Sequence, residues 1–369
     1  MKLFFVKLKR NFIPLLFFAF MLCLIFFSKS NIVAVKNSLN IWINNVVPSL
    51  FPFFIATELL NNTNIPRQIG YVFNKIMRPL FNVPGIGAYA LFMGIVSGYP
   101  VGAKIVTNFR NNNLCTKEEA ERLITFTNNS GPLFILGTVG ISLFYDSSIG
   151  ILLLFTHILA CLSVGIIFRF WKSKTRYSRN IDVLSNNLTF NSLGEVISKS
   201  ILSAIKSIVL IGGFVVLFGI IISILRNTQI LNFLVILITP LFNLVHIKTD
   251  FIIPIITGII ELTNGITMIS SVASKNLGVN VIIAAFLLGF GGISITLQVL
   301  SIISKSDISI KPYMLGKLLH GILASFYTFL IISFIPYFNY LTIYWRSNEN
   351  FLIASSGLLS KVLGKTSSM

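Results

Sequence analysis

The residues from Ala88 to Thr107 read AYALFMGIVSGYPVGAKIVT, an apolar run interrupted by the polar sequence Ser97-Gly98-Tyr99-Pro100. Glycine favours irregular backbone and proline lacks a backbone N–H, so a continuous helix is expected to break here. Inside a bilayer, a freed backbone group costs several kcal/mol unless protein or a water-filled cavity satisfies it. The stretch therefore predicts a helix break that lies within a bundle of membrane helices.

The composition indicates that lipid, and not water, surrounds most of the chain. Hydrophobic residues make up 54% of the sequence and charged residues only 11%, with a mean hydropathy of +0.85. A soluble domain carries roughly 25% charged residues. We predict an all-α, polytopic integral membrane helix bundle of about eight full spans plus two broken or re-entrant segments. The apolar segments lie at 12–28, 41–60, 88–107, 123–144, 149–170, 202–225, 230–246, 251–273, 281–304 and 314–334.

The formal net charge of +18 does not indicate a nucleic-acid partner, because Lys and Arg lie between apolar segments and not along one exposed face. Basic residues that flank spans stay on the cytoplasmic side. If 88–107 is a re-entrant hairpin, nearly all basic residues of the first half share the side of the N-terminus, and only Lys29 and Lys36 lie opposite. This favours a hairpin and a cytoplasmic N-terminus. Too few basic residues follow 251–273 to decide whether this segment crosses the membrane or turns back. The sequence therefore leaves open whether the two halves are parallel or inverted.

Three pairs of segments occur in the same order in the two halves, at a separation of about 160 residues. The sequence GIVSGYPVG at 94–102 pairs with GIIELTNG at 258–265, FTNNSGP at 126–132 with FLLGFGG at 286–292, and His157 with His320. We predict an internal repeat with a binding site at its interface. The expected divisions are N-terminal spans and a cytoplasmic loop at 1–86, repeat halves at 87–170 and 201–340, a basic linker at 171–200 and a tail at 341–369.

The polar and glycine residues at these breaks form the candidate site. The N-terminal ends of half-helices suit anionic or polar ligands, and their C-terminal ends suit cations. We expect a site for a small polar solute or an ion; the alternative is that Gly and Pro only allow closely packed helices to kink. The candidate substrate-binding residues are Ser97, Gly98, Tyr99, Pro100, Lys104, Asn128, Asn129, Ser130, Gly131, Glu261, Thr263, Asn264, Gly291, Gly292 and Gln298.

Glu261 and Lys104 are the ionisable residues within the broken segments. A lone charge there costs at least about 2.5 kcal/mol, so we predict that the two pair across the repeat interface, with Glu261 as a proton or cation acceptor. The alternative is that Lys104 reaches the membrane surface along its stem. His157 and His320 could relay protons, but we interpret them as neutral, hydrogen-bonded residues at a helix interface.

Other sequence patterns are structural. Thr116-Lys-Glu-Glu119 predicts a capping box at a helix start. Cys161 lies one helical turn after His157, but two candidate ligands do not make a zinc site. The sequence lacks a phosphate-binding loop and a clustered set of catalytic carboxylates. We therefore expect no catalytic residues, no metal and no cofactor.

Four stretches resemble a known family: VPSLFPFFIATELL (47–60), MRPLFNVPGIGAYALFMGIVSGYPVGAKIV (77–106), EAERLITFTNNSGPLFILGTVG (119–140) and FGGISITLQVLSI (290–302). They are similar to the YlbJ family of sporulation integral membrane proteins of endospore-forming Firmicutes, and the likeness ends near Trp345. That family is assigned a nucleoside-recognition or Gate domain, which resembles the cores of nucleoside and ferrous-iron transporters. It is associated with formation of the spore cortex.

The resemblance implies a multi-pass membrane protein that acts at the membranes around the forespore and serves cortex formation. We expect it to move an unknown small polar solute or ion; the rival interpretation is a non-transporting scaffold that recruits cortex-building proteins. The expected partners are the lipid bilayer, the solute or ion, and either a second copy of the chain or other sporulation membrane proteins. Nucleic acid is not among them.

Overall fold

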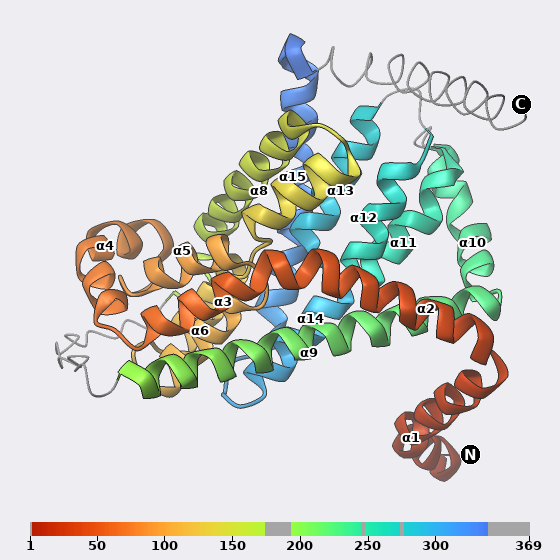
Figure 1. Ribbon diagram of the computed structural model, residues 1–369, viewed down its shortest axis with the longest axis horizontal. Coiled ribbons are helices and arrows are strands. Elements are labelled where there is room, and N and C mark those ends of the chain that lie inside the picture. The colour runs from red at the N-terminus through yellow and green to blue at the C-terminus, as the bar shows by residue number, and fades with distance from the viewer. Residues whose placement is uncertain (1, 174–192, 245–247, 274–276, 339–369) are drawn as a thin grey trace, which may run out of the picture.

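The computed structural model describes residues 2–173, 193–244, 248–273 and 277–338, and within them the regular structure is helical (Figure 1). The first half contains α1 (Lys2–Phe26), α2 (Ser28–Ile41), η1 (Trp42–Val46), α3 (Val47–Asn61), α4 (Ile65–Phe81), α5 (Gly87–Ser97), α6 (Val101–Asn111), α7 (Lys117–Thr127), η2 (Phe134–Leu143) and α8 (Ser147–Phe168). The second half contains α9 (Leu193–Asn227), α10 (Ile230–Leu244), η4 (Thr249–Phe251), α11 (Ile252–Ile260), α12 (Leu262–Ser271), α13 (Leu277–Phe290), α14 (Gly292–Ile303) and α15 (Ile310–Phe334). The expected linker and tail fall mostly outside these residues.

The distribution of side chains is that of a membrane protein. Large apolar residues such as Phe17, Ile236 and Phe329 are exposed, whereas polar residues such as Asn128 and Glu261 are buried. Within the described residues, five helical stretches are long and apolar enough to cross a bilayer: 28–61, 147–168, 193–227, 277–303 and 310–334. A lipid environment stabilises apolar side chains on the surface, and it favours polar side chains that are buried inside the protein. The predicted all-α, polytopic membrane fold is confirmed.

Two helix pairs fold back on themselves as hairpins. In the first, α5 and α6 pack together and turn at Gly98-Tyr99-Pro100. In the second, α11 and α12 turn at Glu261, and a Cβ atom added at Gly265 would lie only 2.0 Å from the Cα atom of Gly258. Glycine allows this close approach of the two backbones. These are the two broken segments that the sequence predicts.

Two further apolar segments also contain a helix break. The segment 123–144 is interrupted at residues 128–131, between α7 and the helical residues that lead into η2, and the segment 281–304 divides into α13 and α14 at Gly291. The backbone of Gly291 has φ +82°, a conformation that ends α13 and that glycine adopts without strain. The core therefore contains four helix breaks: two at the hairpin turns and two within through-going segments.

The two halves carry the same order of elements and run in opposite directions. Each has two broken pairs, α5–α6 with α7–η2 and α11–α12 with α13–α14, followed by a long helix, α8 or α15. The helices α2 and α3, which precede the broken pairs of the first half, lie beside α9, which precedes those of the second half (Figure 1). The start of α2 meets the end of α9, where Ser30 Oγ donates to Asn227 Oδ1 at 3.3 Å, and Trp42 Nε1 donates to the Ile208 carbonyl at 3.1 Å further along. Equivalent helices are thus antiparallel, and the repeat is inverted.

The loops around the first hairpin gather at one end of the molecule. The Arg78 guanidinium forms an ion pair with Glu119 at 2.8 Å, and Arg122 donates to the carbonyls of Asn82 and Trp171 at 2.9 and 2.7 Å. The ends of α4 and α8 therefore lie beside the start of α7. This arrangement is the one that a hairpin at 88–107 requires, because a full crossing would place the α6–α7 loop at the opposite end.

Candidate functional site

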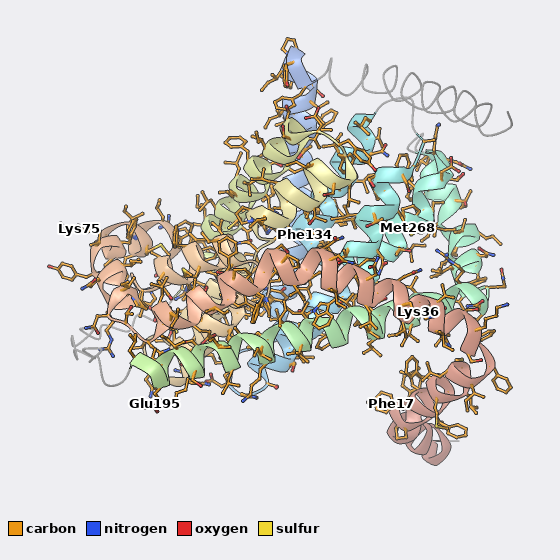
Figure 2. All side chains as sticks on the ribbon, in the orientation of Figure 1. Phe17, Lys36, Lys75, Phe134, Glu195 and Met268 are labelled. Atoms are coloured by element: carbon orange, nitrogen blue, oxygen red, sulfur yellow. The ribbon has the colours of Figure 1, made fainter. Side chains whose placement is uncertain are left out.

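Three of the four helix breaks contribute residues to the wall of one cavity of about 60 Å³, and the fourth, at Gly291, lies against Tyr99 of that wall. Its wall includes Tyr99 from the α5–α6 turn, Ser130 and Gly131 from the α7–η2 break, Glu261 from the α11–α12 turn, and Gln298 from α14. Figure 2 shows Phe134, which also lines the cavity, between Lys75 and Glu195 toward one end and Lys36 and Met268 toward the other. The remaining wall residues are Val46, Ser49, Leu50, Ile211, Val215, Leu262, Thr263 and Ile295.

Glu261 is the acidic residue of this wall, and it is only 3% exposed. Its carboxylate accepts hydrogen bonds from the backbone N–H of Thr263 at 3.1 Å and of Asn264 at 2.8 Å, and from the Asn264 side chain at 2.8 Å. It therefore caps the N-terminus of α12, where the helix dipole stabilises a negative charge. Among the described residues, no Lys or Arg side chain forms an ion pair with it.

Tyr99 connects the first hairpin to the second half. Its hydroxyl donates to the Leu288 carbonyl of α13 at 2.9 Å, and a Cβ atom on Gly291 would lie 3.2 Å from the Tyr99 hydroxyl. On the other side, Gly98 has φ +78° and packs against Gly131. Three of the four breaks therefore meet around one aromatic ring at the cavity.

Asn128 and Asn129 hold the α7–η2 break in place and do not line the cavity. Asn128 accepts a hydrogen bond from the Ala103 backbone N–H at 3.4 Å and donates to the Tyr313 hydroxyl at 3.1 Å. Asn129 donates to the Phe126 carbonyl at 2.9 Å and to Cys161 Sγ at 3.3 Å. Their amide groups thus satisfy backbone and side-chain groups that the break leaves without helical partners.

Lys104 does not pair with Glu261, so that prediction is wrong. Its ammonium group forms an ion pair with Glu58 of α3 at 2.5 Å and donates to Ser203 and Ser207 of α9 at 2.8 and 3.2 Å. Lys104 lies about one helical turn along α6 from Pro100, where its side chain reaches α3 and α9. The prediction fails because it placed the partner at the repeat interface, whereas Glu58 of α3 supplies the carboxylate.

Lys317 of α15 is a buried ionisable residue that the sequence patterns did not single out as a candidate. Its Nζ atom lies 3.1 Å from the Asn128 carbonyl oxygen and 3.1 Å from His320 Nδ1, and it lies 5.0 Å from the centre of the Tyr99 ring. His320 Nε2 is 3.0 Å from the His157 carbonyl oxygen. The signal available in the sequence was an ionisable residue within the apolar stretch 314–334, one helical turn before His320.

The candidate residues therefore divide into two groups. Six line the cavity: Tyr99, Ser130, Gly131, Glu261, Thr263 and Gln298. The others shape the breaks around it or lie further away: Ser97, Gly98, Pro100, Lys104, Asn128, Asn129, Asn264, Gly291 and Gly292. Ser97, for example, shares a hydrogen bond of 2.7 Å with Thr57 of α3.

The described residues contain no cluster of three or more His, Cys, Asp or Glu side chains that could hold a metal ion. The donor set at the cavity is instead one carboxylate, hydroxyl groups and an amide, set among apolar side chains. Such a set suits a small ligand that forms hydrogen bonds and complements one negative charge, and it includes no His or Cys side chain.

Comparisons with known proteins agree with this architecture. The sequence profile of the Gate family, described as nucleoside recognition, matches residues 43–170 and 208–307, which contain all four breaks. The chain is also 35% identical over 313 residues to the sporulation integral membrane protein YlbJ of Bacillus subtilis (strain 168), covering 81% of this chain and 76% of that protein. No solved structure matches. The chain therefore belongs to the Gate family of membrane proteins, in which the sporulation integral membrane protein YlbJ is a relative.

Proposed function

We propose that this chain is a sporulation membrane protein that moves a small polar solute or an ion through its Gate core and thereby serves formation of the spore cortex. The observation that carries the proposal is this cavity, where residues of three helix breaks and of α14 surround a buried carboxylate. Irregular backbone at membrane depth is tolerated where protein buries it or where it lines a solute pathway. The relation to YlbJ supports the role in sporulation.

The chemistry of the cavity narrows the class of solute. Glu261 supplies a negative charge that has no cationic partner among the described residues, while Tyr99, Ser130 and Gln298 supply hydrogen-bonding groups. A solute that carries a positive charge or several hydrogen-bond donors complements this wall best. The cavity of about 60 Å³ holds a solute only when the core opens further.

Uptake into proteoliposomes tests the proposal. The purified chain is reconstituted and supplied in turn with labelled nucleosides, metal ions, amino sugars and dipicolinate. Glu261→Gln keeps the size of the side chain and one cap acceptor but removes the charge, so uptake by this variant should fall about tenfold or more, the effect of losing about 1.5 to 3 kcal/mol. Glu195→Gln, on an exposed acid at the start of α9, is the matched control and should transport like the parent chain.

The same pair of variants separates transport from a scaffold role in sporulating cells. If the chain transports, Glu261→Gln should reach its membrane yet fail to support a cortex, whereas Glu195→Gln should support one. Normal cortex with Glu261→Gln, together with no uptake of any tested solute by the parent chain, would contradict the proposal and favour a scaffold.

We further propose that the N-terminus is cytoplasmic and that the chain resides in the membranes around the forespore. The shared location of the basic loops at one end of the molecule supports this orientation. A soluble reporter fused at Asn187, between α8 and α9, should be active in the cytoplasm and not outside the cell. A reporter there that is active only outside would contradict the orientation.

A further inference from the structure

A second polar cluster lies beside the cavity, and the transport proposal assigns it no role. It consists of Lys317 and His320 of α15 and His157 of α8, which are 1%, 0% and 2% exposed. The two imidazole rings lie with their centres 4.4 Å apart. A buried lysine is costly in a membrane protein unless it serves a purpose there.

The hydrogen bonds define which imidazole nitrogen carries a proton. His320 Nε2 faces the His157 carbonyl oxygen at 3.0 Å, and a carbonyl only accepts, so this nitrogen donates. His157 Nε2 accepts from the Ser130 backbone N–H at 3.2 Å, so the proton of a neutral His157 is on Nδ1. His157 Nε2 is thus an acceptor, and a neutral His320 presents Nδ1 as an acceptor to Lys317.

The surroundings of Lys317 satisfy both of its protonation states. A neutral amine has two N–H groups, and two acceptors lie 3.1 Å from Nζ: the Asn128 carbonyl oxygen and His320 Nδ1. An ammonium group has a third N–H, and the face of the Tyr99 ring, 5.0 Å from Nζ, is an environment that attracts a cation. Among the described residues no carboxylate forms an ion pair with Lys317 and fixes its charge.

Few other titratable groups face this lysine from the elements packed around it. On α15 itself they are His320 and Tyr313, on α8 His157 and Cys161, and at the α5–α6 turn Tyr99. The neighbouring helices α13 and α14 carry no Asp, Glu, Lys, Arg, His, Cys or Tyr. On α7, Glu121 pairs with Lys172 and Arg122 donates to backbone carbonyls, away from this cluster.

We propose that Lys317 is a proton-binding site of the Gate core and that the proton is the coupling ion of transport. The neutral amine takes a proton from hydronium on one side of the membrane, leaving water, and the ammonium returns a proton to water on the other side. Nζ holds the Asn128 carbonyl at the break of the first half, and Tyr99 contacts both Nζ and the cavity. A change of charge at Nζ therefore acts on the contact between the halves. The coupling role rests on the proposed transport function.

Solid-state NMR of the chain in liposomes tests the proton site without any solute. With lysine labelled at ¹⁵Nζ, the shift distinguishes an amine from an ammonium group. One resonance should convert from ammonium to amine as the pH is raised from about 5 to about 9, and it should be absent in both Lys317→Met and Lys317→Arg. Lys199→Met, at an exposed ion-paired lysine of α9, should leave that resonance unchanged. If the resonance lost in both Lys317 variants stays ammonium throughout this range, the proposal is overturned.

A second measurement tests coupling and keeps it separate from transport itself. Liposomes with the dye pyranine trapped inside receive each compound of the uptake panel, and internal pH is followed together with solute uptake. In the parent chain, solute uptake should be accompanied by proton movement; in Lys317→Met, the number of protons moved per solute molecule taken up should fall toward zero, whatever rate of solute uptake remains. Equal proton movement in both chains overturns the coupling role. If the parent chain moves no compound, the transport function fails, and the NMR titration still decides whether Lys317 binds a proton.

Discussion

At the scale of single residues, the first hairpin depends on two glycines, Gly94 and Gly102, that pack against the same backbone carbonyl oxygen. Cβ atoms added at Gly94 and Gly102 would lie 1.7 and 2.0 Å from the Thr127 carbonyl oxygen. Because that oxygen belongs to the backbone at the end of α7, it cannot rotate away as a side chain would. The two residues thus fix the distance between the hairpin and the α7–η2 break.

We predict that Gly102→Ala lowers the free energy of unfolding by more than about 2 kcal/mol, because the added methyl group forces two backbones apart. Thermal unfolding of the purified chain in detergent measures this. Gly213→Ala is the control: a Cβ atom there meets nothing within 4 Å, so within α9 the change should raise stability by about 0.5 to 1 kcal/mol. Equal melting temperatures for the two variants would contradict the close approach.

The residues of the site were only partly accessible from the sequence. The polar and glycine content of the breaks identified Tyr99, Ser130 and Glu261 before their positions were known, since such residues stand out in apolar segments. The partner of Lys104 could not be derived, because an ion pair depends on which helices lie side by side. Lys317 could not be identified from the breaks, because it lies in the unbroken helix α15.

At the scale of elements, α7 begins with the capping box that the sequence predicts. Thr116 Oγ1 accepts from the Glu119 backbone N–H at 3.1 Å, and the Glu119 carboxylate accepts from the Thr116 backbone N–H at 2.9 Å. The same carboxylate also binds Arg78 of α4. The start of α7 is therefore tied both to its own backbone and to α4.

Thr116→Ala should cost about 1 kcal/mol of stability, because the Glu119 N–H loses its acceptor. Thr116→Ser keeps a hydroxyl in the same place and should recover most of the loss. Chemical or thermal unfolding in detergent gives the comparison. A Thr116→Ser variant as unstable as Thr116→Ala would show that the methyl group, and not the cap, matters at this position.

The sequence predicts helical elements well and their interruptions less well. Pro100, with its neighbouring glycine, identified one break directly, and Glu261 with its polar neighbours identified another. The breaks at 128–131 and Gly291 lie within segments whose average hydropathy is typical of continuous spans, so their lengths suggested full crossings. Only packing shows that α8 runs past both α7 and η2.

At the scale of the whole molecule, the antiparallel contact of α2 and α3 with α9 makes the repeat inverted. The sequence analysis left this open because few charges follow the second hairpin. The structure shows the inverted arrangement because contacts along the two segments run in opposite order. Ser30, at the start of α2, meets Asn227, at the end of α9, whereas Lys104 binds both Glu58, near the end of α3, and Ser203, in the first part of α9.

A cross-link tests this arrangement. With Cys23, Cys115 and Cys161 replaced by Ser, the pair Ser30→Cys and Asn227→Cys should form a disulfide on mild oxidation, because the native side chains lie 3.3 Å apart. A protease site placed between α8 and α9 makes the product visible: the two halves should stay joined on a gel after cleavage unless a reductant is added.

The matched control for the cross-link combines Ser30→Cys with Ser203→Cys, at the opposite end of α9. A parallel arrangement of α2 and α9 would bring this control pair together and separate the first. Joined halves in the control, and separate halves in the test pair, would therefore contradict the inverted repeat.

The wide turn η1, from Trp42 to Val46, holds more residues per turn than an α-helix, and Val46 touches the cavity. Such a turn can relax to ordinary pitch only if α2 rotates about its own axis. Two contacts with α9 oppose that rotation: Trp42 covers Gly212, and Ser38 Oγ lies where a side chain on Gly219 would be. Gly212 and Gly219 leave room for Trp42 and Ser38. Residues of α9, in the other half of the chain, therefore hold the winding of the helix at the cavity wall.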